Sequence, residues 1–495
     1  LLGCLLSFNV MAQVKAISGL VTDVTGEPVI GASVVEVGTT NGVITDLNGK
    51  FSLKVAPNSQ FLVSYIGYKQ QTIKVGSEST YNIVLKEDAE VLDEVVVVGY
   101  GSQKKVNVTG AVGMVSAEAL EARPVANASQ ALQGVVPGLN LTVGNNGGAL
   151  DGTLNMNIRG AGTIGDGSGS SPLVLIDGIE GDLNTVNPND IESVSVLKDA
   201  ASASIYGARA SFGVILVTTK SGKSGKTNVS YSGSARFSDA IGIPDIMDSY
   251  TFAQYFNRAS ANKGGGDIFA PAVMERIKAY QEGTLKATTV DNGAGIWQKW
   301  ANANGNTDWF EEFYDHWAPS QEHNLSINGG TDKTQYLISG SFLDQKGLMR
   351  HGSDKFQRYT LNGKITTAVT DWFKVTYSTK WTREDFERPT YLTGSFFHNL
   401  ARKWPVHPAY DPNGFPMDEG EVEQMENGGK QNSQKDFYTN QLQLVFEPIK
   451  NWKINLDGSV RTTTQYQHWE VLPVYAYNVD GDPYYTVSVS YTHLT

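Results

Sequence analysis

Residues 372–383, WFKVTYSTKWTR, decide the fold class of this chain. From Phe373 to Trp381 every second side chain is one that favours strands (F, V, Y, T, W), and K, T, S and K lie between them. A period of two places the two kinds of side chain on opposite faces of a β-strand. Similar runs occur at 227–237, 322–328, 334–343, 357–368, 437–447, 452–463 and 468–478. Together they predict eight long antiparallel strands.

The connections between these runs alternate in length. The short ones are 329–333, 369–371 and 448–451, and the long ones are 238–321, 344–356 and 384–436. Short turns at one end and long loops at the other are typical of outer-membrane β-barrels. Trp372, Phe373, Phe446 and Trp452 flank the short turns, where an interfacial aromatic girdle belongs. A soluble β-sandwich would also alternate, but it does not explain this order of loops, which only the link near 464–467 breaks.

The composition agrees with a β-rich chain that has many turns. Charged residues make up 18% of the 495 residues and glycine accounts for 52 of them, which excludes a coiled coil or a disordered protein. The net charge of −12 argues against a nucleic-acid binder with a basic footprint. No apolar run after the first dozen residues is long enough for a transmembrane helix, although a membrane barrel would not need one.

The first residues, LLGCLLSFNVMAQ, read as the apolar core of a secretory signal. We therefore expect residues 1–12 to be a signal-peptide remnant and the record to be truncated at its N-terminus. Cys4, the only cysteine, lies inside this segment, so the exported chain would have no disulfide, zinc-thiolate or thiol chemistry. A lipoprotein site at Cys4 is the weaker alternative, because the apolar run continues to Val10.

Two further regions precede the long strands. Residues 13–88 hold short alternating runs between turn signals such as Asn41-Gly42, which predicts a small β-sandwich that serves as a scaffold or docking module. Residues 102–222 mix strand and helix signals, with a short helix near 127–132, a hairpin turn at Asp177-Gly178, and a strand followed by a helix of small residues that ends at Gly207.

The segment between these regions, EDAEVLDEVVVVGYG (87–101), allows two interpretations. Its four consecutive valines fit one more buried strand. They also fit an exposed extended segment that pairs with the sheet edge of another protein. Composition alone favours the buried strand.

No motif for catalysis or for a cofactor meets its structural requirements. Gly160, Gly162 and Gly165 match GxGxxG, but more Gly and Ser follow where a helix is needed, and Ser221 to Ser224 lack the first glycine of a phosphate loop. His316 and His323 lack metal-binding spacing. Loop Ca²⁺ at Asp411, Asn413 and Asp418, or at Asp480 and Asp482, is conceivable, although turn formation explains these residues better. We expect no enzyme, no metal centre and no cofactor.

The chain resembles the N-terminal half of SusC/RagA-type TonB-dependent transporters from the outer membrane of Bacteroidota, over about residues 14–480. The motifs that carry the resemblance are GLVTDVTGEPVIGASVVEVGTTNGVITDLNGKFSL, DEVVVVGYG, LQGVVPGLN, PLVLIDG, DIESVSVLKDAASASIYGARASFGVILVTTKSGK and HNLSINGGTDKTQYLISGSFLDQKGLM. The resemblance implies an all-β-dominated fold with a carboxypeptidase-regulatory-like β-sandwich (13–88), a linker with a TonB box (89–101), an α+β plug domain (102–222) and the first strands of an antiparallel transmembrane β-barrel (223–488).

The resemblance also implies site residues. The TonB box would comprise Asp93, Glu94, Val95, Val96, Val97, Val98, Gly99, Tyr100 and Gly101. The plug signature would comprise Arg159, Gly160, Asp177, Gly178, Lys198, Asp199, Tyr206, Gly207, Arg209 and Gly213. Plug charges at Arg159, Asp190, Glu192, Lys198, Asp199 and Arg209 would pair either with the inner wall of the barrel or, equally well, within the plug.

TonB, energised through ExbB and ExbD, would add a strand to 94–98 and pull on the plug, with the sandwich and plug facing the periplasm. A SusD-like surface lipoprotein would cover the barrel and capture an oligosaccharide, or in some relatives a peptide. Trp404, Tyr410 and Phe415 are candidate ligand contacts, because aromatic faces suit sugar rings. A siderophore or metal-chelate receptor, and a surface adhesin without transport, are the alternatives.

The barrel expected from the resemblance would close with 22 strands. Eight strands would leave open edges that lipid does not tolerate, so this chain alone is not expected to transport. The final residues, 489–495, resemble read-through of a sequencing adapter.

Overall fold

The structure is a computed structural model whose chain divides into two compact units, Leu1–Gly110 and Ala111–Thr495. It describes residues 15–39, 41–57, 59–65, 68–86, 95–98, 101–104, 112–121, 123, 125–143, 150, 154–160, 171–199, 203–450 and 452–485. Within these ranges no helix is long and apolar enough to cross a membrane.

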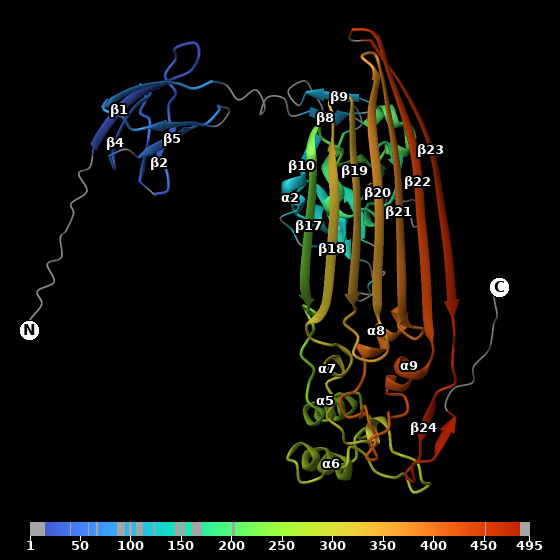
Figure 1. Ribbon diagram of the computed structural model, residues 1–495. Helices are drawn as coiled ribbons and strands as arrows, with labels where there is room; N and C mark the ends of the chain where they lie inside the picture. The colour runs from blue at the N-terminus through green and yellow to red at the C-terminus, as the bar shows by residue number, and fades with distance from the viewer. Residues whose placement is uncertain are drawn as a thin grey trace, which may run out of the picture. The chain divides into compact units, whose positions relative to one another are not determined.

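The first unit contains a sandwich of two small sheets (Figure 1). One sheet has the order β4-β1-β7 and the other β3-β2-β5-β6. Their bounds are β1 Lys15–Thr22, β2 Ser33–Glu36, β3 Gly42–Ile44, β4 Lys50–Val55, β5 Gln60–Ser64, β6 Gln71–Lys74 and β7 Thr80–Val84. In β4, buried Phe51, Leu53 and Val55 alternate with exposed polar residues, and they join Ile17 and Phe61 in one core. The predicted β-sandwich is confirmed.

The same unit contains a two-stranded antiparallel sheet, β8 (Val95–Val98) with β9 (Gly101–Lys104). Val95 pairs with Lys104, and Val98 pairs with Gly101. The valine run is therefore extended, and one of its edges is already paired.

In the second unit, the plug is a five-stranded sheet of order β10-β15-β16-β13-β14 with short helices around it. Its elements are β10 Val112–Ser116, α2 Ala117–Glu121, α3 Ala128–Leu132, β11 Leu139–Val143, β12 Leu154–Ile158, β13 Leu173–Ile176, β14 Ile179–Glu180, η2 Leu183–Thr185, η3 Pro188–Asp190, β15 Ile191–Leu197, η4 Ser204–Ala210 and β16 Val214–Thr219. Strands β15 and β16 are buried almost throughout, with Val194, Val196 and Ile215 fully enclosed in the core of the plug.

Three local predictions for the plug are confirmed. Helix α3 and the β13–β14 hairpin form as expected, and Asp177 (φ 49°) and Gly178 (φ 85°) take the left-handed conformation that this turn requires. The helix of small residues ends at Gly207 as expected, although its geometry is that of a 3₁₀-helix. Gly207 (φ 68°) takes a conformation that most residues avoid, and this kink separates the first part of η4 from a second short segment that runs to Ala210.

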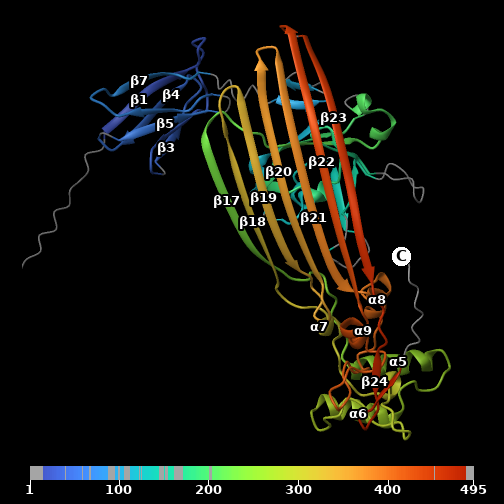
Figure 2. The same cartoon turned by 45° about the vertical axis from the view of Figure 1, so that its right-hand side comes forward.

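The wall is a seven-stranded antiparallel sheet of order β17 to β23, and the plug lies against one of its faces (Figures 1 and 2). The bounds are β17 Gly225–Ser238, β18 Ala318–Gly330, β19 Thr334–Lys346, β20 Lys355–Thr370, β21 Phe373–Pro389, β22 Lys430–Ile449 and β23 Trp452–Trp469. Neighbouring strands pair in sequence order, and β17 and β23 are the two edges. The sheet is part of a barrel and is not closed.

The predicted eighth strand at 468–478 is wrong. Strand β23 runs without a break to Trp469, and the polar residues at 464–467 belong to it. The later residues form a separate hairpin, β24 (Tyr475–Tyr477) with β25 (Pro483–Tyr485). With this correction the short and long connections alternate without exception.

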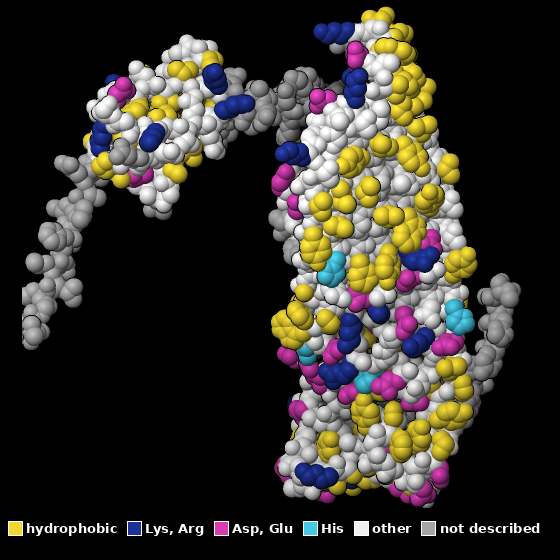
Figure 3. All heavy atoms as spheres, in the orientation of Figure 1, with side chains coloured by type: hydrophobic (Ala, Val, Ile, Leu, Met, Phe, Trp, Pro, Cys, Tyr) yellow, Lys and Arg dark blue, Asp and Glu magenta, His cyan; other side chains and the backbone are white. Residues whose placement is uncertain are grey.

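The face of the wall that points away from the plug is apolar along much of its length (Figure 3). Exposed side chains on this face include Ile338, Leu361, Ile365, Tyr377, Leu442, Leu456 and Val460. Trp372 and Trp452 are about half exposed at the short connections, and Phe373 stacks on Phe446 with ring centres 4.5 Å apart. Charged residues gather nearer the long connections. This order is that of a lipid-facing barrel surface.

The long connections fold together into a loop assembly with cores of its own (Figure 1). Its elements are α5 Ser249–Asn262, α6 Pro271–Gln281, η5 Trp300–Asn302, α7 Trp309–Phe313, α8 Gly394–Leu400, α9 Val422–Asn427, β24 and β25. Trp309, Phe313 and Phe396 are almost fully buried in one core, and Phe269 and Val406 in another.

Candidate functional site

Buried polar and charged side chains gather at the interface between the plug and the wall. On each of five strands of the wall, a side chain makes a hydrogen bond to the plug, and that side chain marks the face of the strand that points inward. These wall residues are Ser339 on β19, Arg358 on β20, Lys380 on β21, Gln441 on β22 and Arg461 on β23. Since side chains alternate along a strand, every second residue from each of them also faces inward.

Asp177, in the β13–β14 turn, is the centre of the strongest contact. Its carboxylate pairs with Lys380 and lies 3.9 Å from the Lys364 ammonium. It also accepts hydrogen bonds from the backbone N–H and the hydroxyl of Thr219, at 2.9 and 2.6 Å. Burial by itself would raise the pKa of Asp177, but the two lysines and the hydrogen bonds hold that pKa well below its ordinary value. The carboxylate therefore stays charged while the plug is seated.

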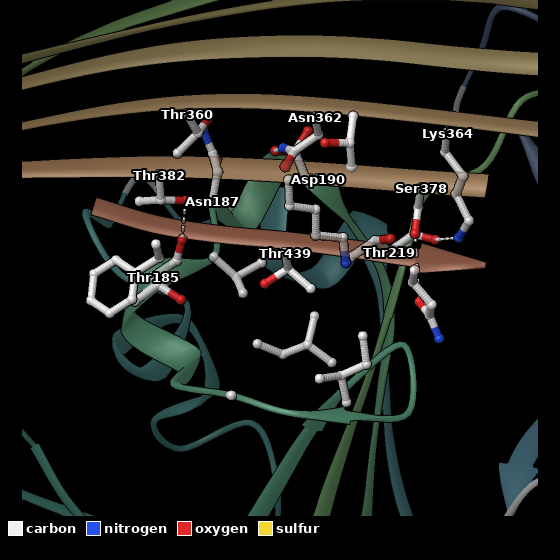
Figure 4. A pocket seen from close by; sticks show the side chains of 18 of the residues that line it. Thr185, Asn187, Asp190, Thr219, Thr360, Asn362, Lys364, Ser378, Thr382 and Thr439 are labelled. Atoms are coloured by element: carbon white, nitrogen blue, oxygen red, sulfur yellow. Dashed lines mark hydrogen bonds between the residues drawn. The ribbon is translucent and has the colours of Figure 1, made fainter. Parts of the chain in front are cut away.

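Asp190, at the end of η3, makes a second contact with different chemistry. Its carboxyl oxygens accept from the Ser339 hydroxyl at 2.7 Å and from the Asn362 amide at 2.6 Å. Burial raises the pKa of Asp190, and the two hydrogen bonds only partly oppose this effect. Figure 4 shows Asp190 beside Asn362, with Lys364 aimed at Thr219. The two acids of the plug thus meet the wall in opposite electrostatic settings.

Arg358 forms a third contact from a fully buried position. Its guanidinium donates to the Ala126 carbonyl at 2.6 Å, to the Asn184 carbonyl at 2.8 Å and to the Asn127 side chain at 3.0 Å. Asn127 lies at the N-cap position of α3, but its side chain makes no capping bond and accepts from this arginine instead. One side chain of the wall therefore holds two separate segments of the plug.

A cavity of about 80 Å³ lies between these contacts (Figure 4). Apolar Ile176 and Ile179 and polar Thr360, Thr439 and Asn362 line it. A cavity of this size has room for a few water molecules beside its polar side chains. Next to it Gly222 passes so close to β19 that a Cβ there would lie 2.4 Å from the Tyr336 backbone.

Most of the predicted plug-signature residues serve the plug itself. Lys198 donates to the Pro137 carbonyl, Arg209 pairs with Glu180 at 2.5 Å on the surface, and the Arg159 backbone N–H donates to the Gly138 carbonyl. Gly160 (φ 97°) and Gly213 (φ 93°) use left-handed conformations, and Tyr206 and Asp199 each take part in an interaction. Among the predicted plug charges, Asp190 makes hydrogen bonds to the wall, to Ser339 and Asn362.

The TonB-box residues are only partly described. Val95–Val98 form β8 and Gly101 begins β9, whereas Asp93, Glu94, Gly99 and Tyr100 lie outside the described residues, as do Gly162 and Gly165. The role of these residues stays a prediction.

The predicted ligand contacts lie in the loop assembly, where their rings pack against other residues. Trp404 contacts Phe252, Phe256 and Phe269, with ring centres 4.9–5.7 Å apart. Tyr410 donates to Glu312 at 3.1 Å, and Phe415 stacks on Tyr477 at 4.0 Å. Burial and the neighbouring carboxylate raise the pKa of Tyr410 to about 12, so it remains a donor. A ligand role for these three residues stays a prediction.

The loop residues considered for Ca²⁺ make different contacts, and the Asp418 carboxylate pairs with Lys299 at 2.6 Å. Asp411 accepts from the N–H groups of Asn413 and Phe415, at 2.8 and 2.9 Å, and the N–H groups of Asp480 and Asp482 donate to Asn478. Across the residues that the structure describes, no group of three His, Cys, Asp or Glu side chains could hold a metal ion. Calcium binding here stays a prediction.

Sequence reasoning missed the wall residues Lys364, Lys380, Arg358 and Gln441, and the ionic role of Asp177. The sequence contains a signal for these wall residues. At the alternate strand positions where Ser, Thr and Asn otherwise occur, Lys380 and Lys364 are charged. A charge among such positions indicates a partner inside the barrel.

Comparison with known proteins places these domains in a family. Residues 104–214 match the TonB-dependent Receptor Plug Domain, and residues 17–97 match the CarboxypepD_reg-like domain. The chain is 36% identical to the TonB-dependent receptor SusC of Bacteroides thetaiotaomicron over 369 residues, which is 72% of this chain and 32% of SusC. It is 32% identical to the TonB-dependent receptor P39 of Formosa agariphila, over 80% of this chain and 35% of that receptor.

Among solved structures, the RagAB peptide importer in its open-open state is similar, with a TM-score of 0.61 and 26% identity over 77% of this chain and 43% of that chain. The chain spans about a third of the length of the curated relatives it matches. These relatives are receptors and importers, not enzymes, and receptors of this kind are outer-membrane β-barrel proteins. The chain belongs to the SusC/RagA-type TonB-dependent receptors.

Proposed function

We propose that the receptor containing this chain imports an oligosaccharide across the outer membrane, driven by TonB and together with a SusD-like surface lipoprotein. The observation that carries the proposal is the plug seated on the wall by a few polar contacts. Asp177, Asp190 and the oxygens bound by Arg358 account for the strongest of them. Polar contacts can be exchanged for water as they break, so a pulled plug can leave its seat at moderate cost.

The β8 strand supports the coupling to TonB. Among the described residues, β8 pairs only with β9. Its second edge is therefore available for another strand. An added strand binds through backbone hydrogen bonds, and a run of valines stays extended while these form. In the proposed orientation the short connections face the periplasm and the loop assembly faces the outside.

An oligosaccharide is the preferred cargo because the resemblance of the sequence motifs to SusC-type transporters implies it. Peptide import is the second candidate, since RagAB is a peptide importer and shares the fold. A growth test separates the two. A strain whose only such receptor contains this chain is expected to lose growth on one polysaccharide when the gene is deleted, while growth on peptides persists; the opposite result would favour peptide import.

Energy coupling is tested by a single backbone change. Val96→Pro removes an N–H and disfavours the strand, so TonB-dependent uptake is expected to fall at least tenfold while cargo binding at the cell surface is unchanged. Val96→Thr, which keeps the backbone donor, is the matched control and is expected to retain uptake. If deletion of residues 93–98 leaves uptake intact, TonB coupling through this segment is wrong; if there is surface binding but no uptake even in the wild type, the adhesin alternative is correct.

A further inference from the structure

The inner face of the wall continues beyond the plug toward the loop assembly. The inward positions are known from the plug contacts, so the strand register gives the side chains that follow in each row. One row crosses five strands, in the order Gln345, Phe356, Phe386, Ser433 and Gln467. Phe356 and Phe386 are therefore cross-strand neighbours, with amide or hydroxyl residues at the positions on both sides of them.

The next row toward the plug alternates in charge. Arg358, Glu384 and Lys435 follow one another on β20, β21 and β22, and Gln465 completes the row on β23. Arg358 is committed to the plug, and Glu384 faces both Arg358 and Lys435. The row therefore presents little uncompensated charge.

These rows form one side of a cavity of about 190 Å³, and Asp182 and Asn184 of the plug form the other. Its outer edge is ordered, because Arg388 lies over the Phe386 ring at 5.6 Å and donates to Gln431 at 2.9 Å. Phe386 itself is 9% exposed, so its position is set by packing before any ligand arrives. Pre-organised sites lose less entropy when they bind.

We propose that Phe356, Phe386, Gln345 and Gln467 bind a sugar unit of a neutral oligosaccharide. A sugar ring has apolar C–H faces and a rim of hydroxyls that both donate and accept. Phenyl rings match the faces, and amides match the rim because each carries both a donor and an acceptor. The inference rests on the proposed function and names the residues that would select its cargo.

Other cargo classes fit this surface less well. A peptide read through its backbone needs an unpaired strand edge, and four of the five strands that form the site, β19 to β22, are paired on both sides. An anionic chelate needs cations without partners, whereas Arg358 and Arg388 are bound to oxygens and Lys435 follows Glu384 in the row.

The test is calorimetry on the detergent-purified receptor. The probes are neutral hexasaccharides of α-1,4-glucose, β-1,4-glucose, xylose, mannose and fructose, and a tryptic digest of casein. At least one hexasaccharide is expected to bind, and Phe386→Leu or Gln467→Ala is expected to weaken it about three- to tenfold. Leu keeps the apolar bulk but removes the flat face, whereas Phe386→Trp restores a ring and is expected to restore affinity.

Gln434→Ala is the matched control, because Gln434 lies next to Ser433 on β22 and points to the opposite face. Thermal unfolding of each variant checks that the barrel is intact. Binding of a hexasaccharide that Phe386→Leu and Gln467→Ala leave unchanged would overturn the subsite. Binding of the digest alone, or of no probe, would overturn the cargo class. Loss of uptake in Val96→Pro with binding unchanged separates these failures from a failure of TonB coupling.

Discussion

At the scale of single residues, the seat of the plug depends on how one aspartate is buried. The β13–β14 turn buries the Asp177 side chain against the wall, where Lys380 and Lys364 compensate its charge. Removing one partner of a buried pair leaves the other charge unsolvated, which costs more than the pair itself contributes. The side chains here are 8–23% exposed, so water moderates this cost.

Asp177→Asn is therefore expected to lower the free energy of unfolding by about 2–4 kcal/mol and to make the plug more sensitive to protease. Glu180→Gln is the matched control, since Glu180 lies in the same hairpin but its partner Arg209 is exposed. That change is expected to cost less than about 1 kcal/mol. Denaturant unfolding and limited proteolysis measure both, and equal effects would show that the buried ion pair does not hold the plug.

At the scale of elements, one histidine joins three long connections. His351, between β19 and β20, contacts Glu312 of α7 at 2.9 Å and Glu426 of α9 at 2.7 Å. A neutral imidazole has one N–H, so two carboxylate contacts require the doubly protonated form. Burial lowers the pKa of His351, but hydrogen bonds to both carboxylates raise it more, and the net shift is upward from 6.5. Tyr410 also donates to Glu312.

A raised pKa in the folded state means that the protonated histidine stabilises the loop assembly. This contribution is complete below pH 6.5 and is lost as the pH rises through the raised pKa. Hydrogen exchange at 347–354 and 422–427 is expected to accelerate over that rise. His351→Gln is expected to remove the pH dependence and cost about 1–3 kcal/mol.

The matched control for this experiment is His316→Gln. His316 also lies between two carboxylates, Asp239 and Glu311, but it is 45% exposed. Its replacement is expected to leave the exchange profile of the loop assembly almost unchanged. A wild-type profile that does not change with pH would contradict the role of His351.

At the scale of the whole molecule, the sandwich and the plug differ in what each needs to fold. The sandwich has its own core around Ile17, Val34 and Phe61. The plug has a core too, yet its Asp177, Asp190 and Asn187 make their polar contacts with the wall. We expect residues 13–88 alone to unfold cooperatively with normal side-chain dispersion, and residues 102–222 alone to be less stable and less ordered. Circular dichroism and NMR spectra of both fragments test this, and a plug fragment as well ordered as the sandwich would contradict it.

The sequence by itself determined the strands of the wall, their alternation, the sandwich and the β13–β14 turn, because each depends on residues close together in the chain. It placed the end of β23 too early. The polar stretch at 464–467 resembles a turn in sequence, and only its pairing with β22 shows that it belongs to the strand. Only the tertiary structure decided that Asp177 meets Lys380, that Arg358 holds Ala126 and Asn184, and that Phe356 lies beside Phe386. These partners are far apart in sequence, and their contact depends on strand register and on the seating of the plug, which no local pattern of residues encodes.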